Sequence, residues 1–141
     1  MTDKIDQLNC VLLIDDDEAT NFFHRIIIEE EWPDLHIQAV PSAKEGLDFL
    51  LSRGAYSNQP KPGIIFLDIN MPAMSGWDFL EEYNDLSKDI HDCAVVSLLT
   101  TSLNPDDEEK AKSIPVVKEF VHKPLTPEVF WKVVDEHFIY N

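Results

Sequence analysis

Residues 64–76 of the chain carry the stretch IIFLDINMPAMSG, which decides the expected fold. Four apolar residues lead directly into Asp68, and Pro72 and Gly76 then prevent the strand from continuing. The pattern predicts a buried strand over 64–67 that carries the Asp68 carboxylate at its carboxyl end. Ligand sites in open parallel sheets lie outside the carboxyl ends of the strands, so Asp68 is a candidate site residue. A lone aspartate at a strand end often only begins a turn or caps a helix, so the other strand ends must also be considered.

Four further apolar segments have strand length, and helical patterns separate the strands. The predicted strands are 10–14, 36–40, 64–67, 94–99 and 116–121. Five helices are predicted after them: one stopped by Pro33, one opened by the capping box at Ser42, one beginning near Ser75, one from Asn104 to about Ser113, and one opened by Thr126. Alternating strands and helices predict an α/β fold with a doubly wound five-stranded parallel sheet, and the flavodoxin-like strand order 2-1-3-4-5 is the leading expectation.

Composition and length limit the classes of function. A chain of 141 residues with 44% hydrophobic content suits one domain, expected to span 1–141 with its core at about 9–139 and with no output domain. No apolar run approaches the roughly 20 residues that cross a bilayer, and no secretory signal is visible, so a cytoplasmic location is expected. The net charge of −16 argues against nucleic acid or an anionic membrane as a direct partner. Cys10 and Cys93 each begin an apolar run and are interpreted as buried residues.

Several secondary features have a simple structural interpretation. The first helix is predicted from apolar residues at helical spacing, namely Ala19, Phe22, Phe23, Ile26 and Ile27. Asp17 and Glu18 are interpreted as solvated first-turn residues rather than ligands. The segment 53–63 is expected to be a surface loop without an assigned function. The five histidines share no spacing and are interpreted as surface or packing residues, and the three tryptophans as core or interface aromatics.

The predicted strand order brings a set of polar side chains to one edge of the sheet. Asp15, Asp16 and Asp68 should converge there, while Thr100 and Lys123 follow the next two strands. Three carboxylates so close together would repel one another, so the arrangement favours a hard divalent cation with oxygen ligands, for which Mg²⁺ is the natural candidate. Asp68 then keeps an oxygen available as a nucleophile. The cation, the Lys123 ammonium and the Thr100 hydroxyl together suit the three equatorial oxygens of a phosphoryl group.

These residues resemble the receiver domain of two-component response regulators over nearly the whole chain. The resemblance rests on four pieces in order: the acidic pair Asp15-Asp16, the motif around Asp68 that includes Met71, Pro72, Met74 and Gly76, the hydroxyl residue Thr100, and Lys123-Pro124. It implies that Asp68 accepts a phosphoryl group from a phosphohistidine on a sensor histidine kinase or a histidine phosphotransfer protein. It also implies a signalling domain rather than a turnover enzyme.

The resemblance further implies individual roles for the site residues. Asp16, Asp68 and the backbone carbonyl of Asn70 would ligate Mg²⁺, with Asp15 acting through a bound water, and Lys123 would pair with the phosphoryl group. Pro72, Gly76 and Pro124 would be structural, and the Lys123-Pro124 bond is expected to be cis.

Thr100 and Phe120 would form the switch that links phosphorylation to a signalling surface. Thr101 follows Thr100 directly, so the choice between these two hydroxyls stays open. The surface made by the helix 106–112, the strand 116–121 and the last helix would respond to phosphorylation, with Phe120 and Trp131 expected to contribute to it. A downstream protein partner or a phosphorylation-dependent homodimer would use that surface. Alternatively, the protein would pass its phosphoryl group onward in a phosphorelay.

Two other classes of function remain as alternatives. A flavodoxin-like FMN-binding electron carrier would share the architecture, although Asp15, Asp16 and Asp17 would repel its phosphate where such proteins need a backbone cradle. A small phosphatase with an aspartyl nucleophile would match the Asp-x-Asp spacing at 15–17, but Ala19 stands where that class has Thr or Val. A coloured protein would favour the first alternative, and turnover of a generic phosphate ester the second.

Overall fold

The computed structural model describes residues 8–86 and 94–138, which form one parallel sheet covered by helices. The strands are β1 (Cys10–Ile14), β2 (His36–Val40), β3 (Ile64–Asp68), β4 (Val95–Thr100) and β5 (Val117–His122). The α-helices are α1 (Glu18–Glu31), α2 (Ala43–Leu50), α3 (Gly76–Asn84), α5 (Pro105–Lys112) and α6 (Pro127–His137), and a short 3₁₀ helix, η1, covers Gly54–Tyr56. The strand order is β2-β1-β3-β4-β5, and every neighbouring pair is parallel, as predicted.

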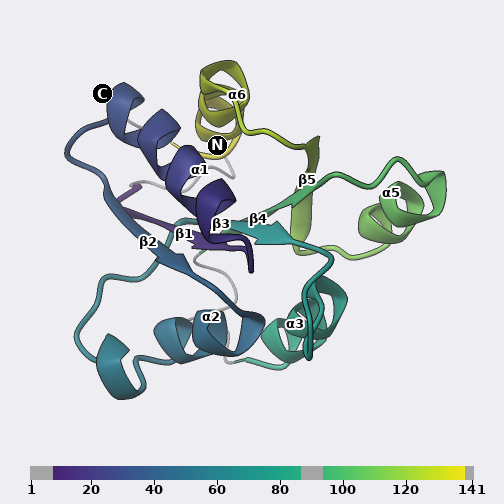
Figure 1. Cartoon of the computed structure of the whole chain (residues 1–141), viewed down its shortest axis with the longest axis horizontal. Helices are drawn as coiled ribbons and strands as arrows, with labels where there is room; N and C mark the ends of the chain where they lie inside the picture. The colour runs from purple at the N-terminus through teal and green to yellow at the C-terminus, as the bar shows by residue number, and fades with distance from the viewer. Residues whose placement is uncertain (1–7, 87–93, 139–141) are drawn as a thin grey trace, which may run out of the picture.

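The sheet separates two hydrophobic clusters, and successive residues of each inner strand alternate between them. Val11 and Leu13 of β1 pack in the cluster that includes α1 and α6, whereas Leu12 and Ile14 pack in the cluster that includes α2 and α3. Figure 1 shows these two helix pairs on opposite sides of the sheet, with α5 beside β5. Because both faces are covered, β1, β3 and β4 are fully buried, which explains why their sequences are mostly apolar instead of alternating with polar residues.

Each α-helix begins at a polar residue whose side chain accepts a hydrogen bond from a backbone N–H in the first turn. The capping residues are Asp17, Ser42, Ser75, Asn104 and Thr126. Ser75 forms a complete capping box with Asp78. Asp17 is thus exposed as expected but caps α1 instead of lying in its first turn, which Glu18 occupies.

Helix α1 forms where predicted, but most of the apolar residues that predicted it do not face the core. Phe22, Phe23 and Ile26 are 66%, 47% and 36% exposed, whereas the buried positions are Asn21, His24 and Ile28. The polar side chains Asn21 and His24 are buried because they make hydrogen bonds to backbone groups at the carboxyl edge of the sheet. These bonds leave the phenylalanines on the solvent side of the helix.

The remaining expectations about the fold have mixed outcomes. Cys10 is buried, which raises the pKa of its thiol to about 12, while Cys93 lies outside the described residues. The segment 53–63 is mostly exposed but contains η1 and ends in the buried Pro62 and Gly63. Trp131 stacks on Trp32, the residue that follows α1, with ring centroids 5.8 Å apart. Within the described part of the chain, no helix is both long and apolar enough to cross a membrane.

Candidate functional site

Three aspartates meet at the carboxyl edge of the sheet, as the strand order predicts. Asp15 and Asp16 follow β1, and Asp68 is the last residue of the neighbouring β3. One carboxylate oxygen from each lies within 4.8 Å of the others. Asp15 and Asp68 are 4% and 6% exposed, whereas Asp16 is open to solvent. The site is therefore a mostly buried acidic cluster with one accessible ligand.

Lys123 brings a positive charge into this cluster from the end of β5. Its Nζ lies 2.6 Å from Oδ2 of Asp15 and 3.1 Å from Oδ1 of Asp68. Burial by itself would lower the pKa of Lys123, but its hydrogen bond to Asp15 and the charges of both carboxylates outweigh burial and raise it. Lys123 therefore stays charged and links the ends of β1 and β3.

Asp68 has the opposite electrostatic balance. Burial, followed by the nearby charge of Asp15, raises the pKa of Asp68, and the contact with Lys123 only partly offsets these effects. Keeping Asp68 ionised in the folded protein therefore costs free energy, and an additional cation would reduce this cost.

The neighbouring backbone fixes the positions of the carboxylates. Asp17 N–H donates to Oδ1 of Asp15 at 2.9 Å, and Asn21 Nδ2 donates to the carbonyl oxygens of Asp15 and Val40. Gly76 lies so close to β3 that a Cβ atom at this position would be 2.5 Å from the backbone oxygen of Asp68. Its N–H also donates to the carbonyl of Ile69 at 2.8 Å, so the turn after Asp68 requires the absence of a side chain at this position.

His24 is a site-supporting residue that sequence reasoning missed. It is 2% exposed, and its Nε2 accepts a hydrogen bond from Leu125 N–H, two residues after Lys123, at 3.2 Å. Burial, and then the charge of Lys123, lower the pKa of His24, so the neutral form that accepts this bond is favoured. The available sequence signal was its position three residues after Asn21, on the same face of α1.

The structure also separates the two adjacent threonines after β4. Thr100 is fully buried, and its Oγ1 accepts a hydrogen bond from Ser102 N–H at 2.9 Å, whereas Thr101 is exposed. The Thr100 carbonyl accepts a hydrogen bond from Lys123 N–H at 2.9 Å. Thr100 is thus the hydroxyl residue that is tied directly to the segment carrying Lys123.

Other predicted site residues lie around this centre. The Lys123-Pro124 bond is cis, as expected. Phe120 is half-buried against the hydrophobic cluster on the α2 and α3 side. Asn70 and Pro72 are exposed in the segment that follows Asp68. Trp131, which was grouped with Phe120 on one surface, instead packs between α6 and α1 because it stacks on Trp32 and donates a hydrogen bond to Glu31.

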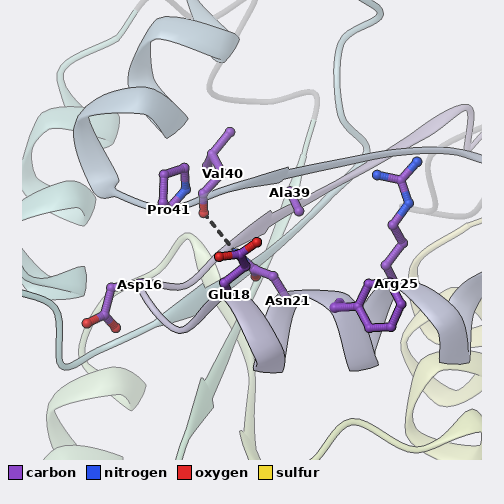
Figure 2. Close-up of a pocket in the computed structure, with 8 residues that line it drawn as sticks. Asp16, Glu18, Asn21, Arg25, Ala39, Val40 and Pro41 are labelled. Carbon is purple, nitrogen blue, oxygen red and sulfur yellow. Dashed lines mark hydrogen bonds between the residues drawn. The ribbon is translucent and has the colours of Figure 1, made fainter.

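A hollow of about 460 Å³ lies beside the acidic cluster, between the start of α1 and the end of β2. Figure 2 shows Asn21 bonded to the Val40 carbonyl at its centre, with Asp16 at one end and Arg25 at the other. The exposed Phe22 also lines this hollow. The accessible side of the acidic cluster therefore adjoins an open, partly apolar surface.

The donor set fits a divalent cation. All three side chains offer carboxylate oxygens, the ligands that Mg²⁺ and related hard cations prefer, and the exposed Asp16 leaves room for water and further ligands. The unfavourable ionisation of Asp68 is a second sign of a site that gains from added positive charge.

Comparisons with known proteins agree with this geometry. The model of the response regulator receiver domain matches residues 11–135. The chain is 30% identical to the response regulator Rcp1 of Synechocystis sp. over 107 residues, which cover 76% of this chain and 71% of that protein.

Solved structures agree as well. A two-component response regulator from Cytophaga hutchinsonii has 32% identity and a TM-score of 0.81, with 92% of this chain and 96% of that chain covered. The Mn²⁺-bound form of Rcp1 has 26% identity and a TM-score of 0.72, with 89% and 88% covered. The chain therefore belongs to the response regulator receiver domain family.

Proposed function

We propose that this protein is a phosphorylation-dependent signalling receiver in which Asp68 accepts a phosphoryl group from a phosphohistidine on a histidine kinase or a phosphotransfer protein. The observation that carries the proposal is the placement of Lys123 between Asp15 and Asp68 within a cluster of three carboxylates. Family membership supports this class of function over the flavin carrier and the phosphatase.

The transfer requires one oxygen of Asp68 to attack phosphorus. A P–O bond forms to Asp68 while the P–N bond of the donor breaks, and the electron pair leaves with the imidazole. Lys123 lies 3.1 Å from Oδ1 of Asp68 and would neutralise a phosphoryl oxygen there. Thr100, held beside this segment through its carbonyl, would supply a hydroxyl to a second oxygen.

Asp16, Asp68 and the Asn70 carbonyl would hold Mg²⁺, with Asp15 acting through a bound water. When bound, the cation would neutralise charge on the transferred group and on the aspartates. The Mn²⁺-bound form of the similar Rcp1 supports a divalent cation in this family.

The phosphodonor is proposed to dock on α1. Phe22, Phe23 and Ile26 form an exposed apolar patch on this helix, and Phe22 reaches the hollow that borders Asp16. Single exposed apolar residues need no explanation, but three large ones within five residues of one helix, beside the acidic site, indicate a protein contact. A donor histidine delivered over this patch would arrive at the open side of the acidic cluster.

The signalling surface is proposed to comprise α5, β5 and α6. A groove of about 250 Å³ lies on this surface, with Phe120, Ala111 and Val117 among its lining residues. Phe120 is only half-buried, so its ring would gain burial by moving inward if Thr100 shifts toward a phosphoryl group. A downstream partner, or a second copy of the chain, would bind here.

The function is tested by mass measurement of the intact protein after incubation with a small phosphodonor and Mg²⁺. We expect one added phosphoryl group on the wild type and none on Asp68→Asn. Asp34→Asn is the matched control, because Asp34 is an exposed aspartate that precedes β2 at the opposite edge of the sheet. It should be labelled like the wild type.

A chelator should abolish the labelling of the wild type. Equal labelling of Asp68→Asn and wild type would contradict the assignment of Asp68, and labelling that survives metal removal would contradict the role of the cation.

A further inference from the structure

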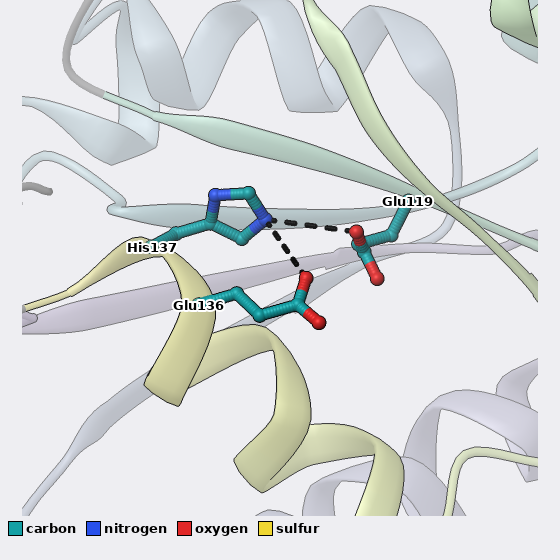
Figure 3. Close-up of side chains that lie close together, drawn as sticks. All are labelled: Glu119, Glu136 and His137. Carbon is teal, nitrogen blue, oxygen red and sulfur yellow. Dashed lines mark ion pairs between the residues drawn. The ribbon is translucent and has the colours of Figure 1, made fainter. Parts of the chain in front are cut away.

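A second group of metal-ligating side chains lies away from the acidic site, where the end of α6 meets β5. It comprises Glu119 of β5 with Glu136 and His137 of α6, and one ligand atom from each lies within 4.8 Å of the others. Figure 3 shows the imidazole edge of His137 directed toward both carboxylates. We propose that these three residues bind a divalent transition-metal ion of the zinc class.

The distances suit metal ligands better than direct hydrogen bonds. Nε2 of His137 lies 3.6 Å from Oε2 of Glu119 and 3.8 Å from Oε2 of Glu136, beyond the range of good hydrogen bonds. Nitrogen and oxygen ligands around a tetrahedral Zn²⁺ lie about 3.4 Å apart, because each is roughly 2.1 Å from the ion. The observed separations are therefore within a few tenths of an ångström of the ligand spacing.

His137 also has an unused ligand atom. Its Nε2 is buried and finds no hydrogen-bond partner among residues 8–86 and 94–138. A buried polar atom without a hydrogen-bond partner is costly, and this one has only the two longer ion-pair contacts to the carboxylates of Glu119 and Glu136. A bound ion would coordinate Nε2 and would also lie between the two negatively charged carboxylates.

The donor set selects the class of metal. One imidazole with two carboxylates favours zinc and its transition-metal neighbours, whereas the all-oxygen cluster at Asp15, Asp16 and Asp68 favours Mg²⁺. Lys132 does not block the proposed site, because it approaches the other oxygen of Glu119, Oε1, at 3.6 Å and is 63% exposed. Glu119 also lines the groove beside Phe120, so a bound ion would border the proposed signalling surface.

The test measures Zn²⁺ binding by competition with a chromophoric chelator at pH 7.5. The protein used is the full chain with the substitutions Asp16→Asn and Asp68→Asn, so that the acidic cluster no longer contributes a Zn²⁺-binding site. We expect one equivalent of Zn²⁺ to bind, and the affinity to fall about tenfold or more in Glu119→Gln, Glu136→Gln or His137→Gln, since even supporting residues around a metal change affinity by such factors. His36→Gln is the matched control, because His36 is an exposed histidine on β2, at the other edge of the sheet.

Two further measurements separate metal binding from a simple ion-pair cluster. Glu136 is 45% exposed, so Glu136→Gln tests the site even if a change at the more buried His137 disturbs folding. In the NMR spectrum, one equivalent of Zn²⁺ should shift the imidazole signals of His137 and leave those of His36 unchanged. The proposal is overturned if the background protein binds no Zn²⁺, or if His137→Gln and His36→Gln bind it equally.

Discussion

Two clusters of carboxylates lie in the part of this domain that the structure describes, and they differ in how the fold assembles them. Asp15, Asp16 and Asp68 come from the ends of adjacent parallel strands, and Lys123 already contacts two of them at 2.6 and 3.1 Å. Glu119 and Glu136 come from an edge strand and a helix, with His137 between them and Lys132 only at the rim, 3.6 Å from Glu119. The first cluster is thus built around a buried lysine side chain, that of Lys123. The lysine of the second cluster, Lys132, lies on the surface.

This difference indicates that the fold requires the charge of Lys123 but not the charge of Lys132. The Lys123 side chain is 14% exposed, and its removal would leave Asp15 and Asp68 buried without a counter-charge. The Lys132 side chain is 63% exposed, so water screens its interaction with Glu119, although Glu119 itself is only 14% exposed. The comparison can be tested by replacing Lys123 and Lys132 in turn with an uncharged residue.

The largest effect is expected for Lys123→Met. The substitution keeps a chain of similar length but removes the charge, and breaking a buried ion pair in this way should lower the free energy of unfolding by about 3 kcal/mol. The measurement is urea unfolding at neutral pH with a chelator present. Added Mg²⁺ should recover part of the loss, because it supplies positive charge to the same carboxylates.

Lys132→Met is the matched control for that experiment. It removes the same charge from the second cluster, and we expect a change of less than about 0.5 kcal/mol, as for other exposed ion pairs. Equal losses in the two variants would show that burial does not distinguish the clusters.

The same contrast explains what the sequence could predict. The strand segment 64–68 and its four counterparts alternate with helices, and the strand order 2-1-3-4-5 expected for such a chain brings the residues after β1 and β3 together. The acidic cluster therefore followed from the order of elements and that expected strand order, which the structure confirms. The Glu119 cluster depends on how α6 lies across β5, which periodicity does not specify. The sequence also did not predict the exposure of Phe22 and Phe23. The buried face of α1 is set by hydrogen bonds between the side chains of Asn21 and His24 and backbone groups distant in the sequence.

An intermediate effect is expected at His24, which supports the first cluster through the segment that carries Lys123. His24→Leu removes the acceptor for Leu125 N–H and leaves a buried donor unpaired, which should lower the free energy of unfolding by about 2 kcal/mol. His24→Gln offers a side-chain oxygen in the same region and should lose less. If the two variants were equally stable, the bond to Leu125 would not contribute to stability.

The pH dependence of the His24 variants provides a second check. Because burial lowers the pKa of His24 in the folded state, the unfolded chain binds a proton first as the pH falls below the usual 6.5. Wild-type stability should therefore decline as the pH falls through this value, and His24→Gln should show a shallower decline. Urea unfolding between pH 7.5 and 5 measures the difference in slope.

The smallest effect concerns Asp68 and has the opposite sign. Burial and Asp15 raise the pKa of Asp68, so the folded protein binds more protons than the unfolded chain just above the usual value of 3.8, and stability falls as the pH rises through that range. Asp68→Asn has no buried charge and should be more stable than the wild type at pH 7 without divalent ions, by about 1 kcal/mol, the size typical of single stabilising substitutions. This advantage should shrink toward pH 4, where the Asp68 carboxyl becomes protonated, and also in saturating Mg²⁺. Thermal unfolding of both proteins across pH measures it, and a less stable Asp68→Asn at neutral pH would mean that the contact with Lys123 outweighs burial.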